Sequence, residues 1–412
     1  MEKVRRAVKQ IACTPPSQRL STLSAFHLSL IPLLSIASSL YSVALRLRRQ
    51  LYRFNLLQQH RLQVPVISVG NLTWGGNGKT PMVEFLARCF ADDGISPLIL
   101  TRGYGGADEA KMLQRQLHRT AAKIGVGANR VAIAARFLEQ YGYVTSPGAS
   151  QKLLSEEKPE ILSKLDMIGI AILDDGMQHL SVCRDVEIVM VNALMPWGNH
   201  QLLPLGPLRE PLTALSRADI LVIHHADLVQ INDIDSIEST IRKVKVSLPI
   251  FFTKMAPMHF FPCRDVSCKL SLKAVDNMSV LCLSGIGFAD SFVQAIKRMG
   301  ATYVDHLDFS DHHLFQLKDI EVVRTRLQEL ESQYGAKPIV VVTEKDYDRA
   351  PEVLEHFKPY EVLVLCSRLQ FLACKGSTED SFKKIMGEHL RQRSAGIYVL
   401  GGSGFHSESG RH

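Results

Sequence analysis

Residues 64–81 read VPVISVGNLTWGGNGKTP. The first part, Val64–Val69, is a short β-branched run of the kind that forms buried strands. A glycine-rich turn follows, and Pro81–Phe90 has the apolar spacing of a helix. A strand, a glycine-rich turn and a helix N-terminus together form an anion cradle, because successive backbone N–H groups and the helix dipole converge on phosphate oxygens. The stretch therefore predicts a phosphate loop.

The residue types of this loop predict the binding of ATP and Mg²⁺. Lys79 is expected to contact the β- and γ-phosphates, and the Thr80 hydroxyl is expected to coordinate the metal. Thr73 stands where the usual GxxxxGK[ST] pattern has its first glycine, but the later glycines still let the backbone approach a phosphate closely. The alternative is a turn that only connects a strand to a helix. The predicted nucleotide-binding residues are Thr73, Gly75, Gly76, Asn77, Gly78, Lys79 and Thr80.

A second apolar run ends in acidic residues. Met167–Leu173 has the pattern of a buried strand, and Asp174 and Asp175 follow it directly. A carboxylate at the carboxyl end of a strand beside a phosphate loop is where such enzymes hold Mg²⁺. Because neighbouring side chains of an extended strand point to opposite faces, one aspartate is expected to coordinate the metal. The other is expected to orient Gln178, His179 or Arg184.

Short β-branched runs alternate with longer amphipathic stretches along the rest of the chain. This alternation predicts an α/β fold with largely parallel sheets, made of a P-loop NTPase-like domain and a second, smaller α/β domain. The other expected strands are Pro97–Leu100, Val186–Val191, Ile220–Ile223, Val280–Leu283, Pro338–Thr343 and Val362–Cys366, and the other expected helices are Val131–Tyr141, Ala289–Met299 and Ile320–Tyr334.

Composition excludes several classes of protein. The 412 residues are 46% hydrophobic and 22% charged, which excludes a disordered chain and a disulfide-dense miniprotein. The eight cysteines contain no CxxC pair, so neither a zinc site nor a disulfide framework is indicated, and a reducing compartment is expected. Nine Lys or Arg residues and one acid lie within residues 1–53 and together give a charge of +8, so the rest of the chain carries −1 of the formal net charge of +7. The nearly neutral remainder argues against nucleic-acid binding.

The first 53 residues divide into a basic part and an apolar part. Residues 1–27 are expected to be a targeting extension, because their first 20 residues are basic and nearly free of acids. From Leu20 to Leu45 there is no formal charge, and an arginine cluster follows. The length could span a bilayer, but the many hydroxyl groups and Pro32 favour a membrane-associated, interfacial amphipathic helix over residues 28–53. The alternative is a first helix that packs only on its own domain.

The remaining boundaries are predicted from composition. The P-loop domain is expected over residues 54–245, and a second α/β domain that closes the active-site cleft is expected over residues 246–395. The stretch Lys243–Pro262, dense in Phe, Pro and Lys, is interpreted as the connection between them. Residues 396–412 are expected to be a disordered tail.

Seven blocks of this sequence resemble, in order, the tetraacyldisaccharide 4′-kinases of lipid A biosynthesis. The resemblance runs from about residue 28 to about residue 390. The blocks are Val66–Pro81, Thr101–Gly106, Asp174–His179 with Arg184-Asp185, Gly198–Pro211, Leu283–Gly287, Phe309–His313 and Thr343–Asp346.

The resemblance implies phosphorylation, dependent on ATP and Mg²⁺, of the 4′-hydroxyl of an acylated disaccharide 1-phosphate at a membrane surface. It implies that Asp108 is the base acting on the sugar hydroxyl and is paired with His312, while Lys79 completes the catalytic set. The expected metal ligands are Thr80, Asp174, Asp175 and Glu109. The planar forks of Arg102 and Arg209 suit the substrate's 1-phosphate. The expected substrate-binding residues are these two arginines with Tyr104, Gln178, His179 and Asn199.

The chain departs from the family pattern just before Asp108. The family's Gly-Asp-Glu-Pro motif corresponds to Ala107-Asp108-Glu109-Ala110, and the longer stretch that usually precedes it is missing. One alternative is therefore a degenerate member that binds lipid without transferring phosphate. Another alternative is a nucleotide-dependent switch or metallochaperone. Trp74 argues against it, because ATPases of that type carry a lysine at this position.

The resemblance also suggests a subcellular location and binding partners. Residues 1–27 precede the usual start of the family, which fits an import sequence. The expected location is the mitochondrion, peripheral on its inner membrane, with the plastid as second choice. The expected partners are the lipid substrate and a membrane surface, with no nucleic acid and no obligate protein partner.

Overall fold

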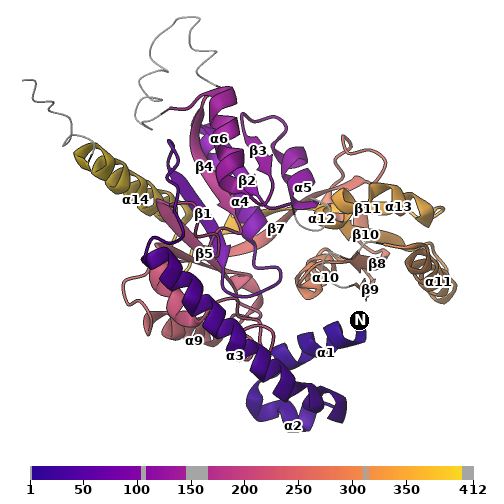
Figure 1. The fold of residues 1–412 in the computed structure, drawn as a ribbon. Coiled ribbons are helices and arrows are strands. Elements are labelled where there is room, and N and C mark those ends of the chain that lie inside the picture. Colours follow the sequence, from indigo (N-terminus) through magenta and orange to yellow (C-terminus); the bar gives the residue numbers. More distant parts are fainter. Residues whose placement is uncertain (1, 104–107, 145–165, 310–312, 314, 401–412) are drawn as a thin grey trace, which may run out of the picture.

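One eleven-stranded sheet runs through the protein (Figure 1). The structure is a computed structural model that describes residues 2–103, 108–144, 166–309, 313 and 315–400. The strand order is β3-β2-β4-β1-β5-β6-β7-β11-β10-β8-β9. The strands are β1 (Val66–Asn71), β2 (Ser96–Thr101), β3 (Lys123–Val126), β4 (Ile168–Asp174), β5 (Val186–Asn192), β6 (Ile220–His224), β7 (Ile250–Pro262), β8 (Ser279–Ser284), β9 (Tyr303–Asp308), β10 (Ile339–Thr343) and β11 (Val362–Phe371).

Strands β7 and β11 join two parallel halves of this sheet. Within the described residues every neighbouring pair of strands is parallel except β7 with β11. Thr253 of β7, level with the end of β6, pairs with Phe371, whereas Phe260 pairs with Leu365, which is level with the end of β10 at Thr343. The carboxyl ends of the first half (β1–β7) therefore face those of the second half (β8–β11) across the middle of β7 and β11.

Apolar side chains pack on both faces of each half. In β4, Ile170 and Ile172 join one core cluster, while Ala171 and Leu173 join another. This alternation is typical of a strand that helices cover on both sides. The helices are α1 (Glu2–Cys13), α2 (Arg19–Thr22), α3 (Ala25–Arg53), α4 (Lys79–Asp92), α5 (Asp108–Leu117), α6 (Arg130–Tyr141), α9 (Ile231–Arg242), α10 (Ala289–Arg298), α11 (Leu317–Tyr334), α12 (Glu344–Arg349), α13 (Pro351–Leu354) and α14 (Glu379–Leu400).

The predicted α/β class and mostly parallel sheet are confirmed, but three strands were not predicted. These are β3, β7 and β9. The stretch Lys243–Pro262, interpreted as the connection between the two domains, is mostly strand β7, which is hydrogen-bonded to β6 on one side and to β11 on the other. Its phenylalanines lie in the core clusters of both halves.

Helix α14 returns the chain to the first half. Phe371 of β11 and Phe382 of α14 pack against Phe85 and Phe251. The second domain proposed for residues 246–395 thus contains a C-terminal part that packs on the first half. Helix α14 continues to Leu400, so residues 396–400, expected to belong to a disordered tail, are helical. Residues 401–412 lie outside the described part of the chain.

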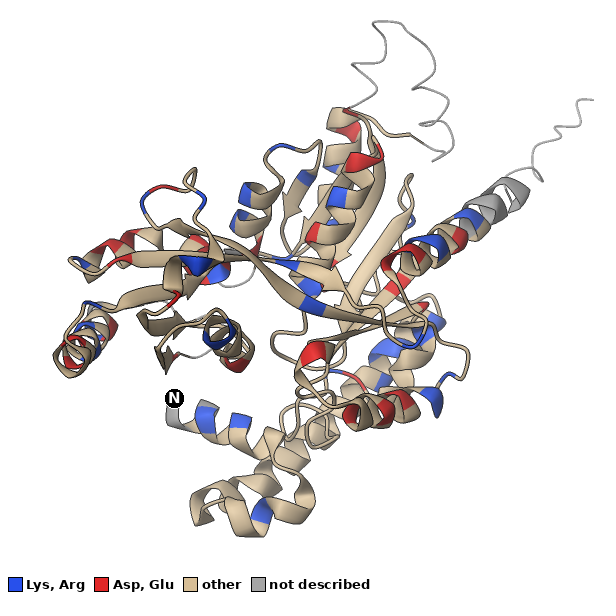
Figure 2. Ribbon diagram, turned by 180° about the vertical axis from the view of Figure 1, so that it is seen from behind, with Lys and Arg blue, Asp and Glu red and all other residues tan. Residues whose placement is uncertain are grey.

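The N-terminal helices pack on the first half at one end of its sheet (Figure 1). Ile11 and Leu23 are buried with Leu205. The Ser38 hydroxyl of α3 donates to the backbone carbonyl of Leu202, and the Tyr41 hydroxyl donates to that of Arg209. Figure 2 shows positions of Lys or Arg, in blue, on the ribbon of α1 near the N-terminus. Helix α3 is long and apolar enough to cross a membrane by length and composition.

Candidate active site

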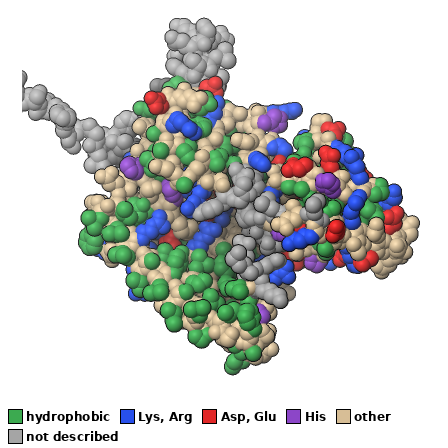
Figure 3. Space-filling view, turned by 45° about the vertical axis from the view of Figure 1, so that its right-hand side comes forward, with side chains coloured by type: hydrophobic (Ala, Val, Ile, Leu, Met, Phe, Trp, Pro, Cys, Tyr) green, Lys and Arg blue, Asp and Glu red, His purple; other side chains and the backbone are tan. Residues whose placement is uncertain are grey.

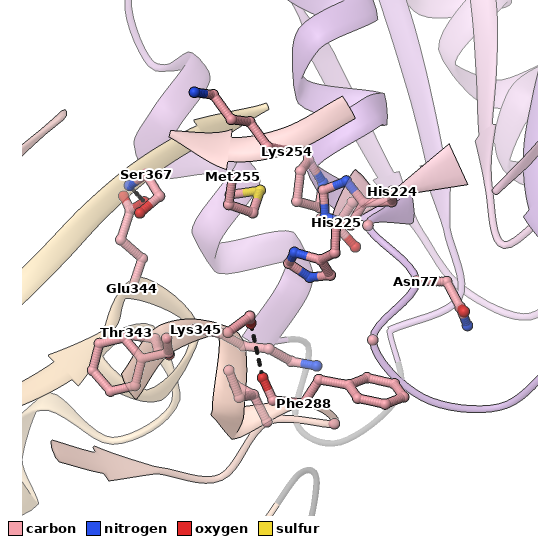
Figure 4. A pocket seen from close by; sticks show the side chains of 18 of the residues that line it. Asn77, His224, His225, Lys254, Met255, Phe288, Thr343, Glu344, Lys345 and Ser367 are labelled. Atoms are coloured by element: carbon pink, nitrogen blue, oxygen red, sulfur yellow. Dashed lines mark hydrogen bonds between the residues drawn. The ribbon is translucent and has the colours of Figure 1, made fainter. Parts of the chain in front are cut away.

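A cavity of about 500 Å³ lies between the facing carboxyl ends of the two halves (Figure 4). The first half contributes the turn after β1 and the acidic end of β4, and the second contributes the turn after β8 and the start of α12. Met255 of β7 and Ser367 of β11 line the cavity between them. Ligands of parallel sheets bind outside the carboxyl ends of the strands. The reversal between β7 and β11 gives both halves access to one cavity.

The predicted phosphate loop lines this cavity. Residues 75–81 border it, and helix α4 begins at Lys79. Gly75 and Gly78 have φ values of 84° and 77°, which favour glycine. A Cβ at Gly78 would lie 2.5 Å from the His224 ring, so glycine is also required for space. The backbone N–H groups of the loop and the N-terminus of α4 carry partial positive charge, so this loop suits the binding of a phosphate chain.

Two predicted nucleotide-binding side chains stabilise the loop from within. The Thr73 hydroxyl donates to Asn77 Oδ1 at 3.2 Å, and Asn77 Nδ2 donates to the carbonyl of Gly75 at 2.8 Å. Thr73 is not among the residues that line the cavity. The Thr73 side chain therefore lies away from the cavity. The Asn77 side chain donates its hydrogen bonds to backbone carbonyls of the loop itself.

Lys79, Asp175 and Arg209 form a charged cluster at the loop. The Lys79 ammonium lies 3.6 Å from Asp175 Oδ1, and Arg209 Nη1 donates to both carboxylate oxygens of Asp175 at 2.8 Å. Burial acts to raise the pKa of Asp175, but the two cations outweigh it and lower the pKa. Asp175 also has a φ of 53°, a strained value for a non-glycine residue. Arg209, predicted to bind substrate, is thus held at the cavity by an acidic partner.

Asp174 is buried and incompletely paired. Among the described residues, its Oδ1 atom has no hydrogen-bond partner, and its Oδ2 atom accepts a long 3.4 Å bond from Thr101. Burial raises its pKa, and the negative charge of Glu109 raises it further, against the effect of Lys79. A buried carboxylate oxygen without a partner, on the cavity wall that Thr80 also lines, suits a cation.

The donor set fits Mg²⁺ bound together with phosphates. Among the described residues no group of three or more His, Cys, Asp or Glu side chains forms a metal cage. Mg²⁺ in nucleotide sites commonly uses one or two carboxylates and completes its coordination with phosphate oxygens and water. Thr80, Asp174 and Asp175 would hold such a metal, whose chemistry is to neutralise charge on the phosphates.

Helix α5 brings a further acid to the cavity. Glu109 lines it and lies 3.4 Å from the Lys345 ammonium of α12. The helix starts at Asp108, whose side chain is not among the described parts of the chain. Two other predicted residues, His312 and Tyr104, lie outside the described residues altogether.

The loop after β4 is held by its own hydrogen bonds. Gln178 Nε2 donates to the carbonyl of Asn71, and Arg184 donates to the carbonyl of His179. Burial lowers the pKa of His179 to about 4, with the positive charges of Arg130 and Arg184 adding to the effect. His179 is therefore neutral at pH 7. Arg102, at the end of β2, is exposed.

Asn199 does not reach the cavity. This buried side chain donates to the carbonyls of Ile11 and Leu205, and its backbone N–H donates to the carbonyl of Ala12. Its prediction as a substrate-binding residue is not supported by the structure. The asparagine instead holds the end of helix α1, because those terminal carbonyls lack partners within the helix.

Several cavity residues were not predicted from the sequence. His224 and His225, at the carboxyl end of β6, both line the cavity, and His225 points into it (Figure 4). Lys254 of β7 and Phe288 of the second half lie around the same space (Figure 4). Arg130, which was also not predicted, lies behind the cavity lining, where it is buried and donates to the carbonyl of Asp175 at 3.2 Å. The position of the two histidines at a strand's carboxyl end was the available signal.

Comparisons with known proteins agree with the resemblance found in the sequence. Residues 30–387 match the family model of tetraacyldisaccharide-1-P 4′-kinase. A relative from Arabidopsis thaliana, named probable tetraacyldisaccharide 4′-kinase, mitochondrial, is 54% identical over 97% of this chain and 100% of its own. The tetraacyldisaccharide 4′-kinase of Syntrophus aciditrophicus is 32% identical over 87% of this chain and 93% of its own. The crystal structure of LpxK from Aquifex aeolicus in complex with ATP shares the fold, with a TM-score of 0.57, 23% identity and coverage of 88% of this chain and 98% of that one.

Proposed function

The chain belongs to the tetraacyldisaccharide 4′-kinase family, and we propose that it transfers the γ-phosphoryl group of ATP to the 4′-hydroxyl of a tetraacyldisaccharide 1-phosphate. The observation that carries this proposal is the placement of Lys79 and the buried Asp174 on one cavity that both halves line. Phosphoryl transfer requires positioning and charge neutralisation above all. A phosphate loop with a carboxylate pair beside it supplies both.

The roles of the residues follow from their charges. Lys79 stabilises the negative charge of the β- and γ-phosphates, and Thr80 with Asp174 and Asp175 holds Mg²⁺. The Asp108 carboxylate accepts the proton of the 4′-hydroxyl as the oxygen forms its bond to phosphorus, and the bond to the leaving ADP oxygen breaks. His312 is the partner that orients Asp108 or takes the proton onward. Glu109 contributes a second acid on the same helix.

We propose that the nucleobase of ATP contacts the aromatic and apolar part of the cavity lining. The aromatic and apolar side chains that line the cavity include His225 of the first half, Phe288 of the second, Met255 and Ile286. Phe288 lies close to the phosphate loop, since a Cβ at Gly75 would be 3.5 Å from its ring. Aromatic rings and apolar side chains beside a phosphate site suit a planar base.

Helix α3 supplies a surface for a membrane. The side chains of Leu33, Ile36, Leu40, Val43 and Leu47 are each at least 59% exposed, and their spacing places them along one side of the helix. The opposite side, with Ser38 and Tyr41, bonds to the protein. Figure 3 shows hydrophobic side chains gathered at the bottom of the view, over α2 and α3. We propose that this apolar stripe lies in the membrane that holds the acylated substrate.

We propose the mitochondrion as the location, peripheral on the inner membrane, with the plastid as second choice. The Arabidopsis relative is named mitochondrial and is matched along its whole length. The basic, acid-poor N-terminus supports import. A fusion of residues 1–30 to a fluorescent reporter should enter an organelle, and a diffuse cytosolic signal would contradict the import proposal.

The deciding experiment is a phosphoryl-transfer assay in mixed micelles. Purified protein is supplied with radiolabelled ATP, Mg²⁺ and tetraacyldisaccharide 1-phosphate, and the phosphorylated lipid is measured. Product should form with the parent protein and disappear with Lys79→Ala. Lys375→Ala, which removes a lysine from a surface ion-pair cluster with Asp235 and Glu238, should retain activity.

The same assay separates the alternatives. Lipid binding without product would favour a degenerate member, for which the shortened segment before Asp108 is the motivating observation. Product that Lys79→Ala does not reduce would rule out the phosphate loop as the site of transfer.

A further inference from the structure

Helix α12 of the second half contacts α5 of the first half through an ion-pair cluster. Arg115 of α5 donates to Asp348 through Nε at 2.9 Å and through Nη2 at 2.9 Å. The same Nη2 donates to Glu344 Oε1 at 2.8 Å, and Gln116 Nε2 donates to Glu344 Oε2 at 3.2 Å. We call Arg115, Gln116, Glu344 and Asp348 the α5–α12 cluster. Figure 1 shows the two helices side by side between the halves of the sheet.

The cluster is shielded from water and fixed in orientation. The Arg115 side chain is 21% exposed, while those of Glu344 and Asp348 are at most 10% exposed. The guanidinium carbon also lies 5.4 Å from the centre of the Phe261 ring of β7. A planar guanidinium that bonds two carboxylates and lies over a ring has few alternative positions. The cluster therefore sets the position of α5 relative to the second half.

The other side of α12 holds the turn after β8. Asp346 Oδ1 accepts a hydrogen bond from the Gly285 backbone N–H at 3.0 Å, and Arg349 Nη1 donates to the Gly285 carbonyl at 3.2 Å. Asp346 and Arg349 form a fully buried ion pair of 3.0 Å. Two residues further on, Gly287 contacts the phosphate loop, since a Cβ there would lie 2.5 Å from the backbone nitrogen of Gly76. Helix α12 is thus linked to the phosphate loop through this turn.

Helix α12 accordingly connects two parts of the proposed site. One face holds α5, whose first turn carries Asp108 and Glu109, and the other holds the turn against the phosphate loop. A further link joins Lys345 of α12 to Glu109 at 3.4 Å. The sequence block Thr343–Asp346 is therefore a structural connection in which Asp346 is buried, and it does not present that acid to a nucleobase.

We propose that Arg115 is a positioning residue, which through Glu344 and Asp348 of α12 fixes the acidic first turn of α5 at the distance from the phosphate loop that phosphoryl transfer requires. The inference rests on the proposed function, because it assigns the transfer step to Asp108 and Glu109. Arg115 itself needs no contact with substrate. A displacement of about 1 Å in a reacting group can lower a rate by about 100-fold.

The test compares Arg115→Ala and Arg115→Lys with Arg326→Ala. Arg326 bonds Asp305 and Glu329 within the second half, so its loss is a matched removal of an arginine from an ion-pair cluster away from α5. Arg115→Ala should lower kcat by about 10- to 100-fold, while the Kd for ADP measured by calorimetry should change less than about 3-fold, because the phosphate loop is untouched. Arg115→Lys should retain more activity than Arg115→Ala. Arg326→Ala should retain the parent kcat.

A second variant and a second measurement guard against a merely structural effect. Asp348→Asn should lower kcat in the same direction, and combining it with Arg115→Ala should add little further loss, because the two residues act through one contact. Hydrogen exchange of the backbone amides of residues 109–117 should be faster in Arg115→Ala than in Arg326→Ala. This measurement needs no enzymatic activity.

The outcomes distinguish the two proposals. Unchanged hydrogen exchange in α5, a kcat of Arg115→Ala within about twofold of the parent, or equal losses of kcat and ADP affinity would overturn the positioning role. An inactive parent protein with faster α5 exchange in Arg115→Ala would overturn the proposed kinase function while leaving the structural link intact. Activity retained in Asp108→Asn would remove Asp108 from the mechanism and with it the proposed reason for positioning α5.

Discussion

The ammonium group of Lys79 lies 3.6 Å from Oδ1 of Asp175, although the two residues are 96 positions apart in the sequence. The contact arises because β1 and β4 are parallel neighbours, so the turns after both strands meet at one edge of the sheet. The Asp174 side chain, next in the chain, lines the same cavity. The cation and the carboxylate pair to which we assign phosphate and Mg²⁺ binding are thereby assembled at one place.

Removal of the Asp175 charge should uncouple nucleotide binding from Mg²⁺. In the parent protein Asp175 repels phosphates unless a metal lies between them, so Asp175→Asn should bind ADP more tightly without Mg²⁺ and gain less affinity when Mg²⁺ is added. Its kcat should fall by about 100-fold, in line with the loss of a group that stabilises transition-state charge. Calorimetric titrations with ADP, with and without EDTA, measure both affinities. Asp235→Asn, a change in an exposed ion pair, is the control, and an unaltered Mg²⁺ effect would exclude this role.

Asp174→Asn should stabilise the metal-free protein at pH 8 but not at pH 4. The pKa of Asp174 is raised in the folded state by burial, so ionisation costs stability. This cost is absent below the unfolded pKa of about 4, grows as the pH rises and is complete above the folded pKa. The gain should exceed about 1.4 kcal/mol at pH 8, the value of a tenfold change in the ionisation constant. Urea unfolding in EDTA at both pH values measures this gain in the free energy of unfolding. Equal gains at pH 4 and pH 8 would contradict a raised pKa of Asp174.

Gly287→Ala should weaken nucleotide binding by forcing the second half away from the phosphate loop. The added Cβ would lie 2.5 Å from the backbone nitrogen of Gly76, and backbone atoms cannot yield as a flexible side chain can. An increase of about 10-fold or more in the Kd for ADP is expected, equivalent to about 1.4 kcal/mol. In the control Gly387→Ala, the nearest atom is the end of the Arg391 side chain at 4.0 Å. An unchanged Kd for Gly287→Ala would show that the turn moves freely.

Charges on the apolar stripe of α3 should abolish membrane association. The double variant Ile36→Glu with Leu40→Glu places two carboxylates on the exposed side of the helix, where they would have to leave water on insertion. Flotation with vesicles of anionic phospholipid should recover the parent protein and little of the variant. The control Val322→Glu changes an exposed apolar residue of α11 and should float like the parent. Equal flotation of all three proteins would place the membrane contact elsewhere.

His225→Ala should weaken the binding of the base without weakening that of the phosphates. The Kd for ADP should rise by about 10-fold or more, since stacking of a base on an aromatic side chain contributes about 1–3 kcal/mol. Inorganic tripolyphosphate, which has no base, should bind the variant and the parent equally. His259→Ala, a change on β7 outside the cavity, serves as the control. Equal losses of affinity for ADP and for tripolyphosphate would show that His225 contacts the phosphates and not the base.

The local motifs of the site could be predicted because neighbouring residues carry them. The turn from β1 to α4 has its glycines at positions that need positive φ, and the acidic pair follows a strand of unmistakable apolar pattern. Thr73 and Asn77 show the limit of this reasoning. Their sequence positions suggest ligand contacts, yet their side chains bond within the loop, and only coordinates can show where a hydroxyl or amide directs its hydrogen bond.

Asn199 lies away from the cavity for a different reason. Its motif is shared with the family, but its partners in this structure are the carbonyls at the end of α1, a segment whose packing no motif indicated. His225 and Phe288 were overlooked for a related reason. Their positions at the cavity depend on the order of strands in the sheet, which local patterns do not specify.

Residue order along the chain was enough to identify a phosphate loop, an acidic strand end and an apolar N-terminal helix, because each is encoded in a short run whose chemistry is local. The arrangement of the cavity required the folded chain. The antiparallel pairing of β7 with β11 turns the second half around so that its strand ends face those of the first. That pairing joins Thr253 to Phe371 and Phe260 to Leu365, and contacts over such separations depend on the packing of the whole sheet.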